Sequence, residues 1–562
     1  MQNICPQCSS NFDITDDDLA FLEKVSPIFN GKKELIPPPT LCPECRMQRR
    51  LAFRNERKLY HRKCDLTGKQ IVSVYAADKP FKAYQSDEWY TDKWNALEYG
   101  RTFDFSRTFF EQWAELMSVV PRMSLVTSPE ANAFNCSYIN FAGHSENCYM
   151  TFDSDYNRDS MYTNVLKHSQ NCVDCSFVHE CELCYECVDC YASYNLRFSE
   201  NCTNCSDCAF LKNCSGCRQC FFCSNLAQKE YHIFNKPYSK SEYEQLLESM
   251  QLNTSSGLHK LKNEFAEFTK QYPQKFQHAL KVENGVGDYL ANVQNCHHCF
   301  DIADAQDLRY CDTLYKAKDC CDVSSFGENI ALIYDSGTIG VEGYNLQFCF
   351  NCVINCSDLL YCNECHRASH CFGCIGVGEK YCILNKQYTQ EEYDTLVPQI
   401  IAHMRTTGEW GQFFPGALSP FGYSETMAQE QFPLTKESAL TNGWNWYEER
   451  TEASDNYMGP MITIPDSITD VPDDITKQIL KCEATGKPYK IIPQELKFYR
   501  EMGIPIPRKC PDQRHKERMA LRNPRKLWKR NCMKCSKEIE TTYSPERPEI
   551  VYCESCYLSS VY

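Results

Sequence analysis

The cysteines near the two ends of the chain occur in pairs whose spacing suits a metal ion. Each end carries two Cys-x-x-Cys pairs, and four thiolates from two such pairs form the usual closed, tetrahedral zinc site. A catalytic zinc would keep one coordination position open, so both sites are predicted to be structural. Paired disulfides are the alternative, which the lack of a secretory signal segment disfavours. The expected cofactor is Zn2+ at two sites, with the ligands Cys5, Cys8, Cys42 and Cys45 at one end and Cys532, Cys535, Cys553 and Cys556 at the other.

The two ends of the chain are copies of one module. Residues 42–64 and 510–532 match without a gap at an offset of 468 residues, with 12 identical positions out of 23. Each module has two knuckle pairs joined by a basic linker, but each retains only one complete set of thiols. The incomplete sites would be Cys64, Thr67, Gln85 and Glu88 in the first copy and Cys482, Thr485, Cys510 and Gln513 in the second.

The basic linkers carry the clearest signal of a binding function. Both 23-residue copies have a net charge of +6, whereas the whole chain has a net charge of −15. Their arginines recur every four residues along a predicted helix of about three turns, which ends near Asn523 because Pro524 follows. Such a face can contact phosphates; the alternative is a face that is solvated or paired with the acidic body. The predicted nucleic-acid contacts are Arg46, Arg50, Arg54, Arg57, Lys58, Arg62, Arg514, Arg518, Arg522, Arg525, Lys526 and Arg530.

Two cysteine-rich arrays lie between the modules, and they too are copies of each other. Residues 202–223 match 353–374 at an offset of 151, and 231–247 match 381–397 at an offset of 150. A metal ligand could not be exchanged for an apolar residue, whereas a small buried side chain could. Such exchanges are Cys202 to Val353, Cys208 to Leu359 and Cys217 to Ala368. The cysteines are therefore predicted to fill the core of a parallel β-solenoid, whose rungs bury their apolar faces against their neighbours.

The predicted fold is mainly β with α connectors, in which zinc-ribbon modules at both termini flank two cysteine-rich parallel β-solenoid-like arrays. The expected parts are a zinc-ribbon module with a basic helix (1–90), an aromatic helical linker (91–134), the first array (135–230), a helical connector (231–289), the second array (290–380), a helix with an irregular excursion (381–475) and the second zinc-ribbon module (476–562).

Four motifs carry a resemblance that covers nearly the whole chain. They are LCPECR-x-x-RRLAFRNER-x-LY-x-RKCDLTGK (41–69), ILNK-x-Y-x-x-EEY (383–393), GEWGQFFP (408–415) and VYCESCY (551–557). With them the chain resembles an uncharacterised bacterial family that combines terminal zinc ribbons with central cysteine repeats. The resemblance implies a zinc-binding, intracellular protein and implies nothing about a reaction.

The motifs of the common enzyme classes are missing from the sequence. It contains no Walker or dinucleotide-binding loop, no His-Glu-x-x-His and no nucleophile elbow. No apolar run approaches the roughly 20 residues of a membrane helix, and 39 cysteines are expected to be reduced in the cytoplasm. The prediction is a non-enzymatic, zinc-stabilised protein with no membrane partner, whose basic modules grip RNA, a ribonucleoprotein or another phosphate-rich partner. The alternatives are a scaffold that binds protein partners on its solenoid face and a thiol redox or metal-buffering protein.

Overall fold

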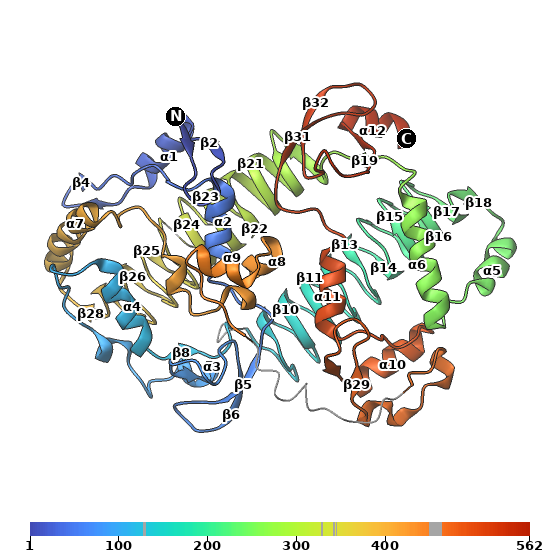
Figure 1. Ribbon diagram of the computed structural model, residues 1–562, viewed down its shortest axis with the longest axis horizontal. Coiled ribbons are helices and arrows are strands. Elements are labelled where there is room, and N and C mark those ends of the chain that lie inside the picture. Colours follow the sequence, from blue (N-terminus) through green and yellow to red (C-terminus); the bar gives the residue numbers. More distant parts are fainter. Residues whose placement is uncertain (128–130, 328–329, 341–342, 344, 449–462, 562) are drawn as a thin grey trace.

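The computed structural model describes residues 1–127, 131–327, 330–340, 343, 345–448 and 463–561. Parts of the predicted linker (128–130), of the second array (328–329, 341–342 and 344) and of the excursion (449–462) lie outside the described residues, as does residue 562. The fold is a mixture of helices and strands that is rich in parallel pairing. Its parallel strands form two groups, with the helices α2 (Pro43–Leu51) and α11 (Pro511–Met519) between them (Figure 1).

The first array is a ladder of short parallel strands. Each strand pairs with the next at a spacing of 12 residues, as in Tyr149 with Met161 and Asn164 with Ser176. An antiparallel hairpin of β17 and β18 closes the ladder. The strands are β9 (Asn140–Gly143), β10 (Tyr149–Asp155), β11 (Met161–Lys167), β12 (Ser176–His179), β13 (Val188–Tyr191), β14 (Tyr194–Arg197), β15 (Ser206–Lys212), β16 (Arg218–Ser224), β17 (Glu230–Ile233) and β18 (Lys236–Pro237).

The backbone of this array explains the spacing of its cysteines. Every third residue from Asn135 to Phe234 has a positive φ. Asn and Asp tolerate this left-handed conformation better than other residues with a side chain, which accounts for the recurring Asn-Cys steps. The cysteine that follows points inward, and its thiol donates to backbone carbonyls. Cys175, for example, lies 3.5 Å from the carbonyl oxygens of both Val173 and Cys184.

The lattice cysteines of the first array form its interior. All of those between Cys172 and Cys223 are buried, and they cluster with Leu166, Val178, Leu196 and Leu211. The second array places Leu359 and Ala368 in its own interior cluster. A small apolar side chain of either kind therefore fits these positions, because the narrow coil has little room for a larger one.

The second array repeats the first with a few added residues. Its early strands pair at a spacing of 12 residues, as in Phe300 with Asp312. Three successive steps are longer by one residue, from Cys321 through Tyr334 and residues 347 and 360, and the last step, from Ser369 to Lys380, is shorter by one. The offset between the arrays therefore grows from 148 to 151 and returns to 150. The strands are β20 (Ala279–Glu283), β21 (Val286–Arg309), β22 (Asp312–Tyr315), β23 (Lys318–Gly327), β24 (Tyr334–Gly340), β25 (Ser357–Leu360), β26 (Ser369–Phe372), β27 (Lys380–Ile383) and β28 (Lys386–Gln387).

Helices cover one apolar face of each array. Phe109 and Trp113 of α4 (Phe109–Val119) pack on the second array, and Phe265 of α6 (Ser255–Thr269) packs on the first. Both helices precede a short strand that pairs with an end module in the same way. These strands are β8 (Arg122–Met123), which pairs with β7 (Ala83–Tyr84), and β19 (Gln274–Lys275), which pairs with β33 (Val551–Tyr552). The other helices are α1 (Asp16–Val25), α3 (Ser86–Trp89), α5 (Lys240–Ser249), α7 (Gln390–Thr407), α8 (Met427–Gln431), α9 (Lys436–Thr441), α10 (Pro493–Met502) and α12 (Glu554–Val561).

The end modules are built on small antiparallel hairpins. The predicted basic helix is shorter than expected, because α11 ends at Met519 and α2 at Leu51. Arg54 and Arg522 therefore lie beyond the helices, in the turn that follows. The hairpins are β1 (Gln2–Ile4) with β2 (Asn11–Asp13), β3 (Ile28–Phe29) with β4 (Lys32–Lys33), β5 (Tyr60–Lys63) with β6 (Gln70–Ser73), β29 (Leu480–Lys481) with β30 (Pro488–Tyr489) and β31 (Trp528–Asn531) with β32 (Glu538–Thr541).

Candidate metal centres and the basic segments

Each end module repeats one knuckle turn twice. In the first knuckle the amide of Cys5 donates to the carbonyl of Ser10, and the amide of Ser9 donates back to Cys5. The knuckles that begin at Cys64, Cys482 and Cys532 make the same pair of bonds. The fifth residue of each turn has a positive φ, and it is either Ser or Gly. All four turns thus keep the backbone of a metal knuckle, although only two have four thiols beside them.

The two complete sets of thiols converge. Within each set the sulfur atoms lie within 4.8 Å of one another. The Sγ atoms of Cys8 and Cys42 are 3.6 Å apart, and those of Cys535 and Cys553 are 3.7 Å apart. Burial raises the pKa of Cys532, but backbone N–H groups, with Cys553 first among them, outweigh it and bring the pKa to about 6. Four such donors fit a soft, tetrahedral metal ion, and both sets could hold one.

The incomplete sites keep their shape through other contacts. The amide of Gln85 donates to the Sγ atom of Cys64 at 3.4 Å. In the second copy the hydroxyl of Thr485 lies 3.7 Å from the Sγ atom of Cys510. Cys64 is buried in an apolar cluster with Tyr84. Hydrogen bonds and packing thus stabilise these two turns.

The arginines of α2 dock on the second array. The guanidinium of Arg50 donates to Asp322 at 3.0 Å, to the hydroxyl of Ser324 at 3.0 Å and to the carbonyl of Tyr310 at 3.3 Å. Arg46 pairs with the same Asp322 at 2.9 Å and lies over the ring of Tyr310. The side chains of Arg50 and Asp322 are fully buried, so this is an internal ion pair with most of its hydrogen bonds satisfied.

The arginines of α11 make the same contacts with the first array. Arg518 donates to Asp174 at 2.7 Å, to the hydroxyl of Ser176 at 3.4 Å and to the carbonyl of Tyr162 at 3.1 Å. Arg514 pairs with Asp174 and lies over the ring of Tyr162. Each partner lies 148 residues before its counterpart in the second array. The docking sites therefore belong to the same duplication as the arrays.

Each basic segment then crosses to the other array. After α2, Arg54 reaches Asp153 of the first array at 3.5 Å, and Arg57 lies over the ring of Phe152. After α11, Arg522 reaches Asp301 of the second array, and Arg525 donates to Asp312 at 2.7 Å. The two segments are thus crossed braces that hold the arrays together (Figure 1).

Two ion pairs join the braces to each other in a reciprocal way. Lys58 binds Asp512 at 2.9 Å, and Lys526 binds Glu44 at 3.3 Å. Lys526 is the counterpart of Lys58, and Asp512 is the counterpart of Glu44. Such an exchange of partners is what a two-fold axis produces in a homodimer, and here one chain supplies both halves.

This docking corrects the expectation that the basic segments form an open phosphate-binding face. A buried guanidinium that is paired with a carboxylate or packed on a ring is not available to a polyanion. Of the predicted contacts, Lys58 and Arg530 are partly exposed and Lys526 is exposed. The buried ones are Arg46, Arg50, Arg54, Arg57, Arg62, Arg514, Arg518, Arg522 and Arg525.

The acidic partners were missed at the level of sequence. Asp174 and Asp322 were visible only as members of the arrays, and their burial could not be inferred from composition. One signal was present, because Tyr162, Asp174 and Ser176 recur as Tyr310, Asp322 and Ser324 at the constant offset of 148. Buried carboxylates repeated in step with a repeated row of arginines indicate docking between the two repeats.

His515 of α11 gives this interface a pH dependence. Burial lowers the pKa of its imidazole from 6.5 to about 4; Arg57 adds to the effect and Glu430 opposes it. Between these pH values the unfolded chain binds more protons, so the free energy of unfolding falls as the pH falls. We expect His515→Met, which installs the counterpart residue Met47, to remove about one proton from this dependence. Urea unfolding at several pH values between about 7 and 5.5 measures it; equal slopes for the two proteins would refute the assignment.

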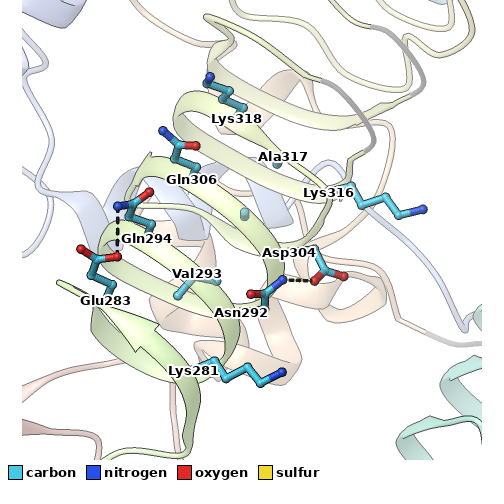
Figure 2. Close-up of a pocket in the computed structure, with 11 residues that line it drawn as sticks. Lys281, Glu283, Asn292, Val293, Gln294, Asp304, Gln306, Lys316, Ala317 and Lys318 are labelled. Atoms are coloured by element: carbon cyan, nitrogen blue, oxygen red, sulfur yellow. Dashed lines mark hydrogen bonds between the residues drawn. The ribbon is translucent and has the colours of Figure 1, made fainter.

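An open polar hollow of about 580 Å³ lies on the early coils of the second array. Figure 2 shows two rows of polar side chains on either side of small apolar residues such as Ala317. Some of them bond to one another, as Asn292 does to Asp304 and Gln294 to Glu283. The hollow is a polar face of the array, with its side chains partly paired along the ladder.

Comparison with known proteins gives no family for the chain. No protein-family model matches it, and no curated protein matches it. One similar solved structure is a putative acetyltransferase from Desulfovibrio desulfuricans G20, with 9% identity and a TM-score of 0.11. The match covers 41% of this chain and 64% of that one, so the chain spans less than two thirds of its length. A likeness of this size carries no argument about fold or activity.

Within the part of the chain that the structure describes, no helix combines the length and the apolar character needed to cross a membrane.

Proposed function

We propose that this protein is a non-enzymatic, zinc-stapled scaffold that binds protein partners on the surfaces of its arrays. One observation carries the proposal: the two basic segments are spent on holding the arrays together. Arg50 and Arg518 each end in a buried carboxylate and a backbone carbonyl of the opposite array. A chain that commits its strongest cations to internal bracing has the design of a rigid frame.

We further infer that each array is a solenoid and that the metal at both ends is zinc. The 12-residue parallel register and the left-handed residue at every third position support coils of constant length. Sets of four thiolates in two knuckles suit structural zinc better than a hard ion such as magnesium or calcium. The burial of the lattice thiols counts against a redox or metal-buffering role, because reactive thiols need access to solvent.

The alternative in which the basic segments grip RNA is weakened by the same contacts. To reach a phosphate, Arg50 or Arg518 would first have to leave its buried carboxylate. Breaking a buried ion pair costs about 3–5 kcal/mol, and several pairs would have to break together. Contacts with phosphate would therefore have to come from exposed residues such as Lys526 and Lys529.

Binding to a labelled single-stranded RNA, followed by fluorescence anisotropy as salt is raised, tests the choice. The scaffold predicts no salt-dependent binding between about 50 and 200 mM salt. Specific phosphate contacts would instead give a slope of log K against log salt of roughly −0.7 per contact. A steep slope that Arg50→Gln and Arg518→Gln together reduce, in protein shown to be folded, would refute the scaffold and restore the RNA-binding function.

A further inference from the structure

A groove of about 340 Å³ lies between the first array, α6 and the C-terminal module. Its floor is apolar and consists of Phe198, Phe210, Phe265 and Leu521. Leu521 is 49% exposed, although its counterpart Phe53 in the other half is 2% exposed. The duplication therefore shows what the same place looks like when it is covered.

The counterparts of the floor residues follow from the registers already described. Phe198 and Phe210 of the first array correspond to Phe348 and Tyr361 of the second, because residues 197 and 209 occupy the steps of 347 and 360. Phe265 corresponds to Trp113, since α6 and α4 precede the equivalent strands β19 and β8 at an offset of 152. All three counterparts are buried.

In the covered half, an aromatic segment of the same chain fills this place. The ring of Trp410 lies 6.2 Å from that of Tyr361. The ring of Phe414 lies 4.2 Å from that of Trp113, and the ring of Phe413 lies 5.4 Å from that of Phe53. Farther along, Phe421 stacks on Tyr75 at 5.3 Å with an interplanar angle of 3°. Tyr75 is the counterpart of Tyr543, which lines the open groove.

The groove is open because the chain is shorter at the equivalent point. After α7 the chain makes the excursion that carries Trp410, Phe413 and Phe414 before it reaches the C-terminal module. After α5, which ends at Ser249, it starts α6 at Ser255. The few residues between them pack elsewhere, against Asp466 and Ser467.

The rim of the open groove has changed in the way that exposure to water demands. Glu200 stands where the covered half has Phe350, and Lys262 stands where it has Phe110. Lys212 binds Glu200 at 2.7 Å, and Lys262 pairs with Glu186. Paired charges keep the rim soluble, while the apolar floor has been retained.

We infer that this groove binds an extended segment of a protein partner, which inserts aromatic side chains spaced like Trp410, Phe413 and Phe414. The inference rests on the proposed scaffold function and names the surface through which the scaffold acts. The partner's aromatic rings take the place of the internal segment against Phe198, Phe210, Phe265 and Leu521. Its polar flanks face the charged rim.

The probe is a fluorescent peptide with the sequence of residues 408–421, titrated with the full-length protein. We expect saturable binding below about 1 mM and a loss of affinity of about tenfold or more with Leu521→Glu. Leu521→Phe, which installs the residue of the covered half, should bind at least as well as the wild type. A peptide in which both phenylalanines are alanine should not bind.

The matched control is Leu440→Glu, a substitution at another exposed leucine (52% exposed) that should leave binding unchanged. The inference fails if the peptide does not bind the wild-type protein, or if Leu521→Glu and Leu440→Glu weaken it equally. That failure is separate from a failure of the scaffold, which salt-dependent RNA binding would reveal. Circular dichroism of each variant verifies that the protein is folded.

Discussion

Cys535→Thr is expected to remove one of the two metal ions from the protein and to unfold its C-terminal module. The substitution gives the complete site the residue that Thr67 supplies at the equivalent position of the first copy. A thiolate set of three leaves an open position, and the folding of a small metal module depends on its ion. Structural zinc contributes on the order of 10 kcal/mol in isolated fingers, so the melting transition of the module should be lost.

Elemental analysis together with a thermal melt measures both effects on one sample. Cys64→Ser is the control, because Cys64 belongs to a knuckle that has only one thiol in its set. This variant should keep the full metal content. Metal content unchanged by Cys535→Thr, or a wild-type content well above the two sets of four thiols, would show that other cysteines are the ligands.

Asp174→Asn is expected to cost about 3–5 kcal/mol of the free energy of unfolding. Asp174 is fully buried and receives hydrogen bonds from both Arg514 and Arg518. The amide keeps the shape of the side chain but removes its charge, so two guanidinium groups remain buried with one carboxylate fewer. Urea unfolding monitored by tryptophan fluorescence gives the change.

Glu517→Gln is the matched control for this prediction, because it breaks an ion pair on the same helix at the surface. Glu517 lies 2.7 Å from Lys509, and both side chains are more than two-fifths exposed. Exposed pairs contribute little, so the change should stay within about 0.5 kcal/mol. If Asp174→Asn cost no more than this, the brace would not depend on its buried pair, and the arginines would be free for another ligand.

The metal ligands could be predicted from the sequence because a knuckle is local. Two thiols three residues apart and a turn that aims them together are properties of a few adjacent residues. The helical row of arginines was local too, and Arg46 and Arg50 do lie on one helix. Its use was not local, because Asp322 lies 272 residues after Arg50. No pattern within the linker could show which of many acidic residues would face it.

The cysteine arrays lie between these two cases. Comparison of the two copies indicated small buried side chains, and the described lattice residues are buried in apolar clusters. The comparison could not give the coil length, because three steps of the second array are longer by one residue. The offset of 151 read from the sequence was the sum of 148 and these three additions. Only the strand register separates the two contributions.

The crossed braces have a consequence for synthesis. Arg50 binds Asp335, which follows it by 285 residues. At roughly 5–20 residues per second, Asp335 is added about 15–60 s after Arg50, and until then the first brace has no acidic partner. Arg518 has no such delay, because Asp174 is made long before it. The two halves of the molecule, alike in space, therefore assemble by different orders of events: the first brace waits for its dock, and the second closes on a dock already in place.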